Sequence, residues 1–265
     1  MNAASPTLEV RSLAKRFPPR NGQAEAPWIL ADLNFNVAND EFLTMVGPSG
    51  AGKTTLLNII AQVDAASGGE ITFRGEAMNP VSGTLKPGWG CQIGYVTQDD
   101  NLLPWRTLID NVTFPLRVQG RLDDAAMERV TTLMRTVNLV GFERYYPHEL
   151  SGGMRKRASL IRTLAYDPPI ILMDEPFGAV DAQTRTALQQ DLLRLWNLGR
   201  KTIIFVTHDI GEAIALGDRC LVLSRSPAKV IAEHRITIKR PRDLSNVYKL
   251  EGFGDMYEMV RRELL

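Results

Sequence analysis

The feature of the sequence that most constrains the fold is residues 42–55, which read FLTMVGPSGAGKTT. Phe42–Val46 is a short apolar run typical of a buried strand, and the following GPSGAGKT fits the pattern G-x-x-x-x-G-K-[ST]. The glycines let the backbone curl, so that successive N–H groups converge on phosphate oxygens. The apolar residues after the loop predict a helix, whose positive N-terminal end attracts the same anion. We therefore expect a site for a nucleoside triphosphate.

The side chains of this loop have separate tasks. Lys53 is expected to reach the β- and γ-phosphates, and the hydroxyl of Thr54 to hold Mg²⁺. A glycine-rich turn that only joins a strand to a helix is the alternative, and the order of strand, loop and helix counts against it. The residues predicted to contact the nucleotide here are Gly47, Pro48, Ser49, Gly50, Ala51, Gly52, Lys53, Thr54 and Thr55.

The composition favours a folded protein without a nucleic-acid-binding surface. The 265 residues allow one large domain or a domain with a subdomain, and 44% hydrophobic residues support a sizeable core. The 31 basic and 30 acidic residues give a net charge of +1, which is not the basic footprint of a nucleic-acid-binding domain. Cys91 and Cys220 lie far apart without metal-ligand spacing, so we expect reduced cysteines that pack in the interior.

The sequence offers no segment that would enter a membrane on its own. The first residues, MNAASPTLEVRS, lack the apolar core of a signal peptide, and no apolar run is long enough to cross a bilayer. We therefore expect a soluble protein, for which any role at a membrane comes through a partner.

The order of the apolar segments predicts an α/β fold. Ile170–Met173 and Thr202–Val206 are continuous apolar runs typical of strands buried on both faces of a parallel sheet. From Pro104 to Asp167 the pattern changes from strands to helices. We predict a P-loop NTPase core with a mostly parallel sheet, an N-terminal antiparallel β subdomain and an inserted α-helical subdomain. The tail from Arg240 onward predicts no element. Other expected elements are Thr7–Phe17, Trp28–Val37, Glu70–Arg74, Cys91–Thr97, Gln183–Gly199, Ile210–Leu216 and Cys220–Leu223.

Two adjacent carboxylates follow the apolar run at 170–173. A strand that ends in Asp174-Glu175 places both at its carboxyl edge, where open α/β sheets bind ligands. Asp174 is expected to hold Mg²⁺ through its water shell, and Glu175 to act as the general base on the attacking water. The alternative is a helix-cap and turn feature, which is the commoner role of such a pair. The phosphate loop upstream favours catalysis.

A second glycine-rich helix start follows the helical region. Ser151, Gly152 and Gly153 precede a strong helical segment, so a serine hydroxyl and a positive helix end form another potential anion site. An N-cap with a turn is the alternative for these three residues alone. The basic run Arg155–Arg157 suggests a nucleic-acid patch, but its side chains point in different directions on one helical turn. A solvated or inter-subunit face is therefore the preferred interpretation.

The sequence LSGGMRKR followed by ILMDEP resembles the signature motif and the second nucleotide motif of ATP-binding cassette (ABC) ATPases. The resemblance covers nearly the whole chain and implies the ABC ATPase fold and hydrolysis of ATP with Mg²⁺. It implies that Phe17 stacks on adenine and that Asp181 lies in the segment after the catalytic glutamate. The catalytic residues implied are Lys53, Gln98, Glu175 and His208, and those around the metal are Thr54, Gln98 and Asp174.

One of these assignments has a plain alternative. His208 is one of only three histidines, and a lone histidine is more often a packed or surface residue than a catalytic one. Its place at the end of the TIIFV run, at the edge expected for Asp174, favours contact with the γ-phosphate.

The resemblance also implies an assembly. In the family, two cassettes pair head to tail, and each ATP lies between the phosphate loop of one and the signature motif of the other. The second anion site at Ser151–Gly153 would then contact the partner's ATP, and one complete motif set allows a homodimer. Met154 stands where most of the family has glutamine, which leaves the serine and both glycines in place.

The resemblance divides the chain into predicted regions. Residues 1–98 and 167–239 form the nucleotide-binding core with the β subdomain, and residues 99–166 form the helical subdomain with the signature motif. Residues 240–265 are a C-terminal tail, so the whole chain is one ABC ATPase domain.

The segment after Gln98 suggests the branch of the family. Leu102, Leu103 and Trp105 are large apolar residues in a loop expected to be exposed, and such a patch usually marks an interface. In cassette importers this region receives a helix of the membrane subunit. LLPWRTLIDNV and DEPFGAVDAQTR resemble the ATP-binding subunits of nitrate, sulfonate and taurine importers. The alternative is that Trp105 packs under the loop.

Two functional hypotheses follow. The first is a peripheral subunit at the cytoplasmic face of the membrane that powers uptake of a small anion, with permease subunits at Gln98–Trp105 and an external substrate-binding protein. The second is a soluble ABC ATPase in DNA repair, translation or cofactor assembly. A single motif set, the lack of a long heptad block and the near-neutral charge favour the first hypothesis.

Overall fold

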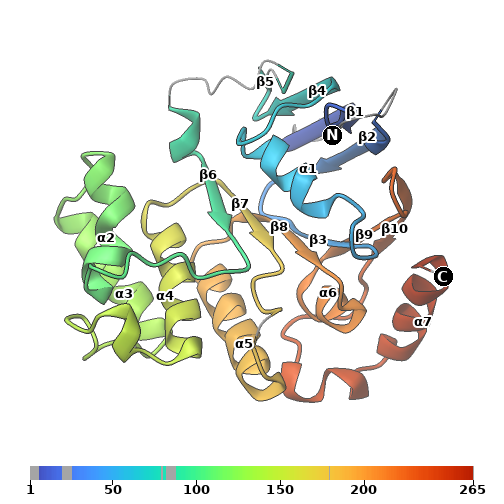
Figure 1. The fold of residues 1–265 in the computed structure, drawn as a ribbon. Coiled ribbons are helices and arrows are strands. Elements are labelled where there is room, and N and C mark those ends of the chain that lie inside the picture. Colours follow the sequence, from blue (N-terminus) through green and yellow to red (C-terminus); the bar gives the residue numbers. More distant parts are fainter. Residues whose placement is uncertain (1–5, 20–25, 79, 82–87, 179, 265) are drawn as a thin grey trace. The chain divides into compact units, whose positions relative to one another are not determined.

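The computed structural model describes the chain except residues 1–5, 20–25, 79, 82–87, 179 and 265 (Figure 1). The described residues form two compact units, which we call unit 1 (residues 1–89 and 202–265) and unit 2 (residues 90–201). No helix in the described part of the chain is both long and apolar enough to cross a bilayer. The regional boundaries predicted above, at residues 98, 166 and 239, stay a prediction.

Unit 1 contains two sets of strands. The antiparallel set has the order β2-β1-β4-β5, and a second set has the order β10-β9-β3-β8, in which β3 pairs in parallel with both β8 and β9. The antiparallel strands are β1 (Leu8–Arg16), β2 (Trp28–Val37), β4 (Gly68–Phe73) and β5 (Glu76–Met78). The others are β3 (Phe42–Val46), β8 (Thr202–Thr207), β9 (Arg219–Leu223) and β10 (Val230–Arg235).

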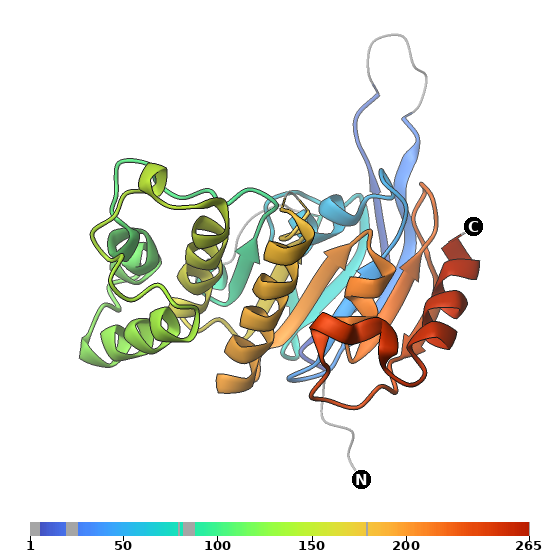
Figure 2. The ribbon, with the colours of Figure 1, turned by 90° about the horizontal axis from the view of Figure 1, so that it is seen from below.

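Hydrophobic burial explains why β3 and β8 lie in the interior of unit 1. Every residue of Phe42–Val46 and Thr202–Thr207 is buried, as expected for parallel strands covered on both faces. The helices of unit 1 are α1 (Lys53–Ile60), α6 (Ile210–Leu216), the 3₁₀ segment η3 (Leu244–Lys249) and α7 (Phe253–Leu264). Figure 2 shows α6 and α7, which pack against each other.

Unit 2 combines a pair of parallel strands with a helical cluster. Its strands are β6 (Ile93–Val96) and β7 (Ile170–Asp174), and the 3₁₀ segment η1 (Trp89–Cys91) precedes β6. Its helices are α2 (Leu108–Val118), α3 (Asp124–Thr136), the 3₁₀ segment η2 (Pro147–Glu149), α4 (Gly152–Ala165) and α5 (Ala182–Leu198). Side chains at 3.6-residue spacing on α2, α3 and α4 pack into one buried apolar cluster.

Capping side chains determine where several helices start. Asp123 accepts a hydrogen bond from the N–H of Ala126 at 2.8 Å and so begins α3. Gly199 follows α5 as its C-cap, as the sequence predicted. The tail from Arg240 onward, for which the sequence predicted no element, contains η3 and α7. Both cysteines are free, and Cys220 is buried.

Candidate functional site

The parallel pairing of β3 and β8 brings two predicted site segments to one edge in unit 1. Val46 is the register partner of Thr207. The phosphate loop directly follows Val46, and His208 directly follows Thr207. Because parallel strands end at the same edge, the loop and His208 begin at the same level there. The sequence predicted His208 at the edge of Asp174, and that stays a prediction because Asp174 belongs to unit 2.

The phosphate loop has the geometry of an anion cradle. Gly52 adopts φ 88°, and a Cβ there would lie 2.8 Å from side-chain atoms of Ile29 and Leu30, so only glycine fits. The Nζ atom of Lys53 donates to the carbonyls of Gly47 at 2.8 Å and Pro48 at 3.0 Å, which folds this cation over the loop. In the described chain no side chain caps the start of α1, and its first turn holds no acidic residue. A negatively charged group suits this helix end.

His208 is an exposed side chain on a firmly held backbone. The hydroxyl of Thr207 donates to Oε2 of Glu212 at 2.5 Å, and the N–H of Asp209 donates to Oγ1 of Thr207 at 3.0 Å. Asp209 in turn caps α6 by accepting from the N–H of Glu212 at 3.1 Å. The residues on both sides of His208 are therefore fixed by one hydrogen-bonded turn.

Phe17, the predicted adenine-stacking residue, follows β1 in unit 1 and is 43% exposed. The Nζ atom of Lys15 lies 4.5 Å from the centroid of its ring. An accessible aromatic ring of this kind offers a flat face to a purine base.

In unit 2, the parallel pairing of β6 and β7 places Gln98 and the carboxylate pair at one edge. Val96 is the register partner of Met173, and both predicted segments follow directly. A Cβ on Gly178 would lie 3.5 Å from Nε2 of Gln98 and 3.7 Å from Oε2 of Glu175. The Gln98 amide and the Glu175 carboxylate therefore both lie next to Gly178, which has no side chain to separate them.

Glu175 adopts a backbone conformation that is uncommon for its type. Its φ angle is 44°, in the left-handed region, and the N–H of Gly178 donates to its carbonyl at 3.1 Å. Such strain is found where the surrounding structure over-determines a functional residue. Burial, and then the negative charge of the neighbouring Asp174, raise the pKa of the Tyr95 phenol on the adjacent strand.

The signature residues and Asp181 line one hollow of unit 2. Ser151 caps α4, accepting from the N–H of Met154 at 3.3 Å, and Asp181 caps α5, accepting from the N–H of Thr184 at 2.9 Å. This hydrogen bond lowers the pKa of the Asp181 carboxyl. The hollow measures about 570 Å³ and is lined by Ser151, Gly152, Gly153, Arg157, Val180, Asp181, Gln183, Thr184 and Ala187. Two helix N-termini therefore open into the same space.

The basic run at the start of α4 is not a solvated face. Arg155 pairs with Asp100 at 3.0 Å, and the buried Lys156 donates to the carbonyl of Gln98. The interpretation as a solvated face is therefore wrong for Lys156, because this side chain is buried, while the inter-subunit alternative stays a prediction. Burial lowers the pKa of its ammonium group. These cations attach the segment after Gln98 to the signature helix.

The apolar patch predicted after Gln98 is reduced to one residue. Leu102 is buried in the helical cluster of unit 2, so its predicted exposure is wrong, and Leu103 is half-buried. Trp105 is 71% exposed, which excludes the alternative that it packs under the loop. The sequence reasoning missed Asn111, a fully buried residue of α2. Its Nδ2 atom donates to the carbonyls of Leu103, Arg106 and Thr107, and its Oδ1 atom accepts from the N–H of Leu103.

The comparisons with known proteins identify the family. A family model described as ABC transporter matches residues 30–178. An uncharacterised ABC transporter ATP-binding protein of Methanocaldococcus jannaschii, MJ0412, is 41% identical over 97% of this chain and 92% of its own length. The chain belongs to the ABC transporter family. The family resemblance of the sequence is thereby confirmed.

Other members of the ABC family have more specific names. The aliphatic sulfonates import ATP-binding protein SsuB of Bacillus cereus is 37% identical over 98% of this chain and 94% of its own length. The taurine import ATP-binding protein TauB of Pseudomonas putida is 40% identical over 84% of this chain and 80% of its own length.

The ABC cassette fold is confirmed by solved structures. The dimeric structure of the ABC transporter cassette MJ0796 matches with a TM-score of 0.73 at 31% identity, covering 86% of this chain and 98% of that one. A post-hydrolysis state of the same cassette, bound to ADP and Pi, gives the same values. The predictions of an ABC ATPase fold and of an ATPase are confirmed.

Proposed function

We propose that this chain is the ATP-hydrolysing subunit of an ABC importer for a small organic sulfonate, such as an aliphatic sulfonate or taurine. The observation that carries the proposal is the pair of helix starts suited to anions, at Gly52 and Ser151, in a chain with relatives named as import ATP-binding proteins. Aliphatic sulfonates and taurine both carry a sulfonate group, so the predicted class of small anions is narrowed to organic sulfonates. SsuB and TauB are named as import proteins, which favours transport over the non-transport alternative.

The residues present suit Mg²⁺ bound with ATP. Thr54 offers a hydroxyl, Gln98 an amide oxygen and Asp174 a carboxylate, which are the oxygen ligands that Mg²⁺ prefers. Among the described residues, no group of three His, Cys, Asp or Glu side chains makes a metal site by itself. Mg²⁺ bound with a nucleotide is usually held by one or two protein side chains together with phosphates and water, and it would neutralise charge on the phosphates.

The chain's own residues account for hydrolysis as follows. Lys53 and the N–H groups of the phosphate loop bind the β- and γ-phosphates, and Phe17 stacks on the base. Glu175 accepts a proton from water as the water oxygen attacks the γ-phosphorus and ADP leaves. His208 contacts the γ-phosphate and Gln98 orients the water. Ser151, Gly152 and Gly153 contact the ATP of a second copy of this chain, and Asp181 contributes to nucleotide binding.

The proposed assembly has two kinds of contact. Two copies pair head to tail, as supported by the dimeric cassette structure named above. Trp105 contacts a multi-spanning permease, since a 71% exposed tryptophan beside the Gln98 loop is a typical interface residue. The subunit then lies at the cytoplasmic face of the membrane, and an external binding protein delivers the sulfonate to the permease.

The test is recovery of a membrane partner from the native cell. The chain is tagged, membranes are solubilised gently, and stoichiometric partners are identified for the wild type, Trp105→Ala and the control Trp28→Ala. Trp28 is also an exposed tryptophan but lies on β2. We expect a permease with the wild type and Trp28→Ala and much less with Trp105→Ala, and uptake of labelled taurine or alkanesulfonate that depends on this chain. Recovery from the soluble fraction only, without a permease, would support the non-transport hypothesis.

A further inference from the structure

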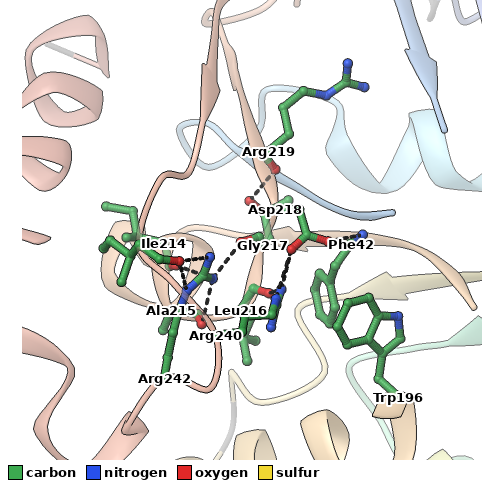
Figure 3. A network of polar contacts seen from close by, with 12 residues as sticks. Phe42, Trp196, Ile214, Ala215, Leu216, Gly217, Asp218, Arg219, Arg240 and Arg242 are labelled. Atoms are coloured by element: carbon green, nitrogen blue, oxygen red, sulfur yellow. Dashed lines mark hydrogen bonds and ion pairs between the residues drawn. The ribbon is translucent and has the colours of Figure 1, made fainter. Parts of the chain in front are cut away.

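The end of α6 is capped by two arginines of the C-terminal tail. The carbonyls at the end of a helix have no partner within it, and here these belong to residues 214–216 and the C-cap Gly217, since the last N–H of the helix turn, that of Gly217, donates to the carbonyl of Ala213. Arg242 donates from Nη1 to the carbonyls of Ile214 at 3.0 Å, Ala215 at 3.1 Å and Gly217 at 2.6 Å. Arg240 donates from Nη2 to the carbonyl of Leu216. All four carbonyls therefore accept a guanidinium N–H, as Figure 3 shows.

Arg242 is a buried cation with a fixed geometry. Its side chain also donates from Nε and Nη2 to the carbonyl of Ile238, at 3.0 and 2.9 Å. Burial, and then the charge of Arg240, lower the pKa of the Arg242 guanidinium to about 10, so it remains charged at neutral pH. The negative end of the helix dipole suits this charge. The planar guanidinium donates from three separate nitrogens, to Ile238 through Nε and Nη2 and to α6 through Nη1, whereas all donors of an ammonium group lie on one nitrogen.

The same end of α6 is attached to strand β3. Arg240 pairs with Asp218 at 2.9 Å, and Oδ2 of Asp218 accepts from the N–H of Phe42 at 3.0 Å. A Cβ on Gly217 would lie 2.7 Å from Oγ1 of Thr44, so the chain passes β3 without room to shift. Phe42 is the first residue of β3, whereas the phosphate loop follows the last residue of this strand, so the tail arginines connect α6 to the end of β3 away from the loop.

The other end of α6 is the turn that holds His208. Asp209 caps the helix and Glu212 accepts from Thr207, the residue before His208. The helix has seven residues, so its two ends lie only about 10 Å apart. The tail also covers this end, because a Cβ on Gly211 would lie 3.6 Å from the hydroxyl oxygen of Tyr248. A short rigid helix transmits a displacement at one end to the other.

We propose that Arg240 and Arg242 are positioning residues for His208, which act through α6, and that the C-terminal tail is thereby required for hydrolysis but not for ATP binding. The inference rests on the role proposed above for His208. It assigns a task to the segment for which the sequence predicted no structure.

The test is a double-mutant cycle on the full-length chain. Arg242→Lys keeps a cation but loses the planar fork, His208→Ala removes the side chain that Arg242 would position, and the third variant combines both. Arg261→Lys is the matched control, since Arg261 lies on α7 and is exposed. Each variant is assayed for kcat with labelled ATP over long incubations, for the affinity of a non-hydrolysable ATP analogue, and for folding by circular dichroism. Arg240→Gln is the second variant should Arg242→Lys fold poorly.

We expect Arg242→Lys to lower kcat about ten- to a hundredfold, as a small misplacement of a catalytic group does, with analogue affinity within about twofold of the wild type. In the His208→Ala background the same substitution should change kcat by less than about twofold, because groups that act as a unit are not additive. An unchanged kcat, effects that multiply fully in the double variant, or an equal loss of analogue binding would overturn the inference. An unchanged kcat in His208→Ala alone would instead refute the role of His208.

Discussion

The ion pair between α4 and α5 allows a stability prediction to be worked from the structure. The side chain of Asp191 is only 3% exposed and accepts from Nε of Arg157 at 2.7 Å and from Nη1 of Arg194 at 3.2 Å. Breaking a fully buried pair costs about 3–5 kcal/mol. In Asp191→Asn, Arg157 is still 24% exposed and the amide oxygen still accepts a hydrogen bond, so we expect a loss of about 2 kcal/mol.

The assay is thermal unfolding without nucleotide. For a chain of this size, a loss of about 2 kcal/mol corresponds to a Tm lowered by about 4–8 °C. Arg194→Met is the control, because the Arg194 side chain is 54% exposed and its pair should contribute less than about 1 kcal/mol. A Tm for Asp191→Asn within about 1 °C of the wild type would refute the reasoning, since the carboxylate would then contribute no more than a surface group.

Three further substitutions test the site. Lys53→Ala should weaken ATP binding at least about tenfold, because hydrogen bonds to charged groups contribute about 1.5–3 kcal/mol. A Kd for ATP equal to that of the wild type, measured by titration, would contradict the phosphate-loop assignment. Glu175→Gln should keep ATP binding and lower kcat by about 10²–10⁴-fold, and an unchanged hydrolysis rate would exclude Glu175 as the base. Ser151→Arg fills the hollow at the signature motif, so the monomer should bind ATP but not dimerise with it. An ATP-dependent dimer of this variant in gel filtration would argue against the head-to-tail arrangement.

The parts of the fold that the sequence predicts are those with a strong local signal. The sequence signal for two strands is an apolar run, and every residue of both strands, Phe42–Val46 and Thr202–Thr207, is buried. Their parallel pairing brings the phosphate loop and His208 to one edge. The helix predicted over Gln183–Gly199 is found at Ala182–Leu198, and its start at Asp181 is fixed by side-chain capping, which is a local interaction. The motifs lie on the expected strand ends, while the roles of their residues stay predictions.

The parts that the sequence does not predict depend on contacts with distant residues. Strand β10 alternates between half-buried and exposed residues and gives no apolar face, and it forms because β9 offers it an edge. Helix α7 has one narrow buried stripe, made by Phe253, Met256 and Val260. The burial of Lys156 has no local signal, since its acceptor, the carbonyl of Gln98, is 58 residues away. The burial of Leu102 has none either, because the apolar cluster around it contains residues of α2, α3, α4 and α5.

The capping of α6 also bears on the order in which the chain is made. By the time residue 209 has left the ribosome, every recognised motif has been synthesised, yet the groups that complete α6 come at residues 240 and 242. Until then, the four carbonyls at the end of this helix have to stay hydrated, because buried carbonyls without a donor are costly. A fragment that contains all the motifs but stops before residue 240 therefore lacks the two arginines that cap α6, although every recognised motif is present.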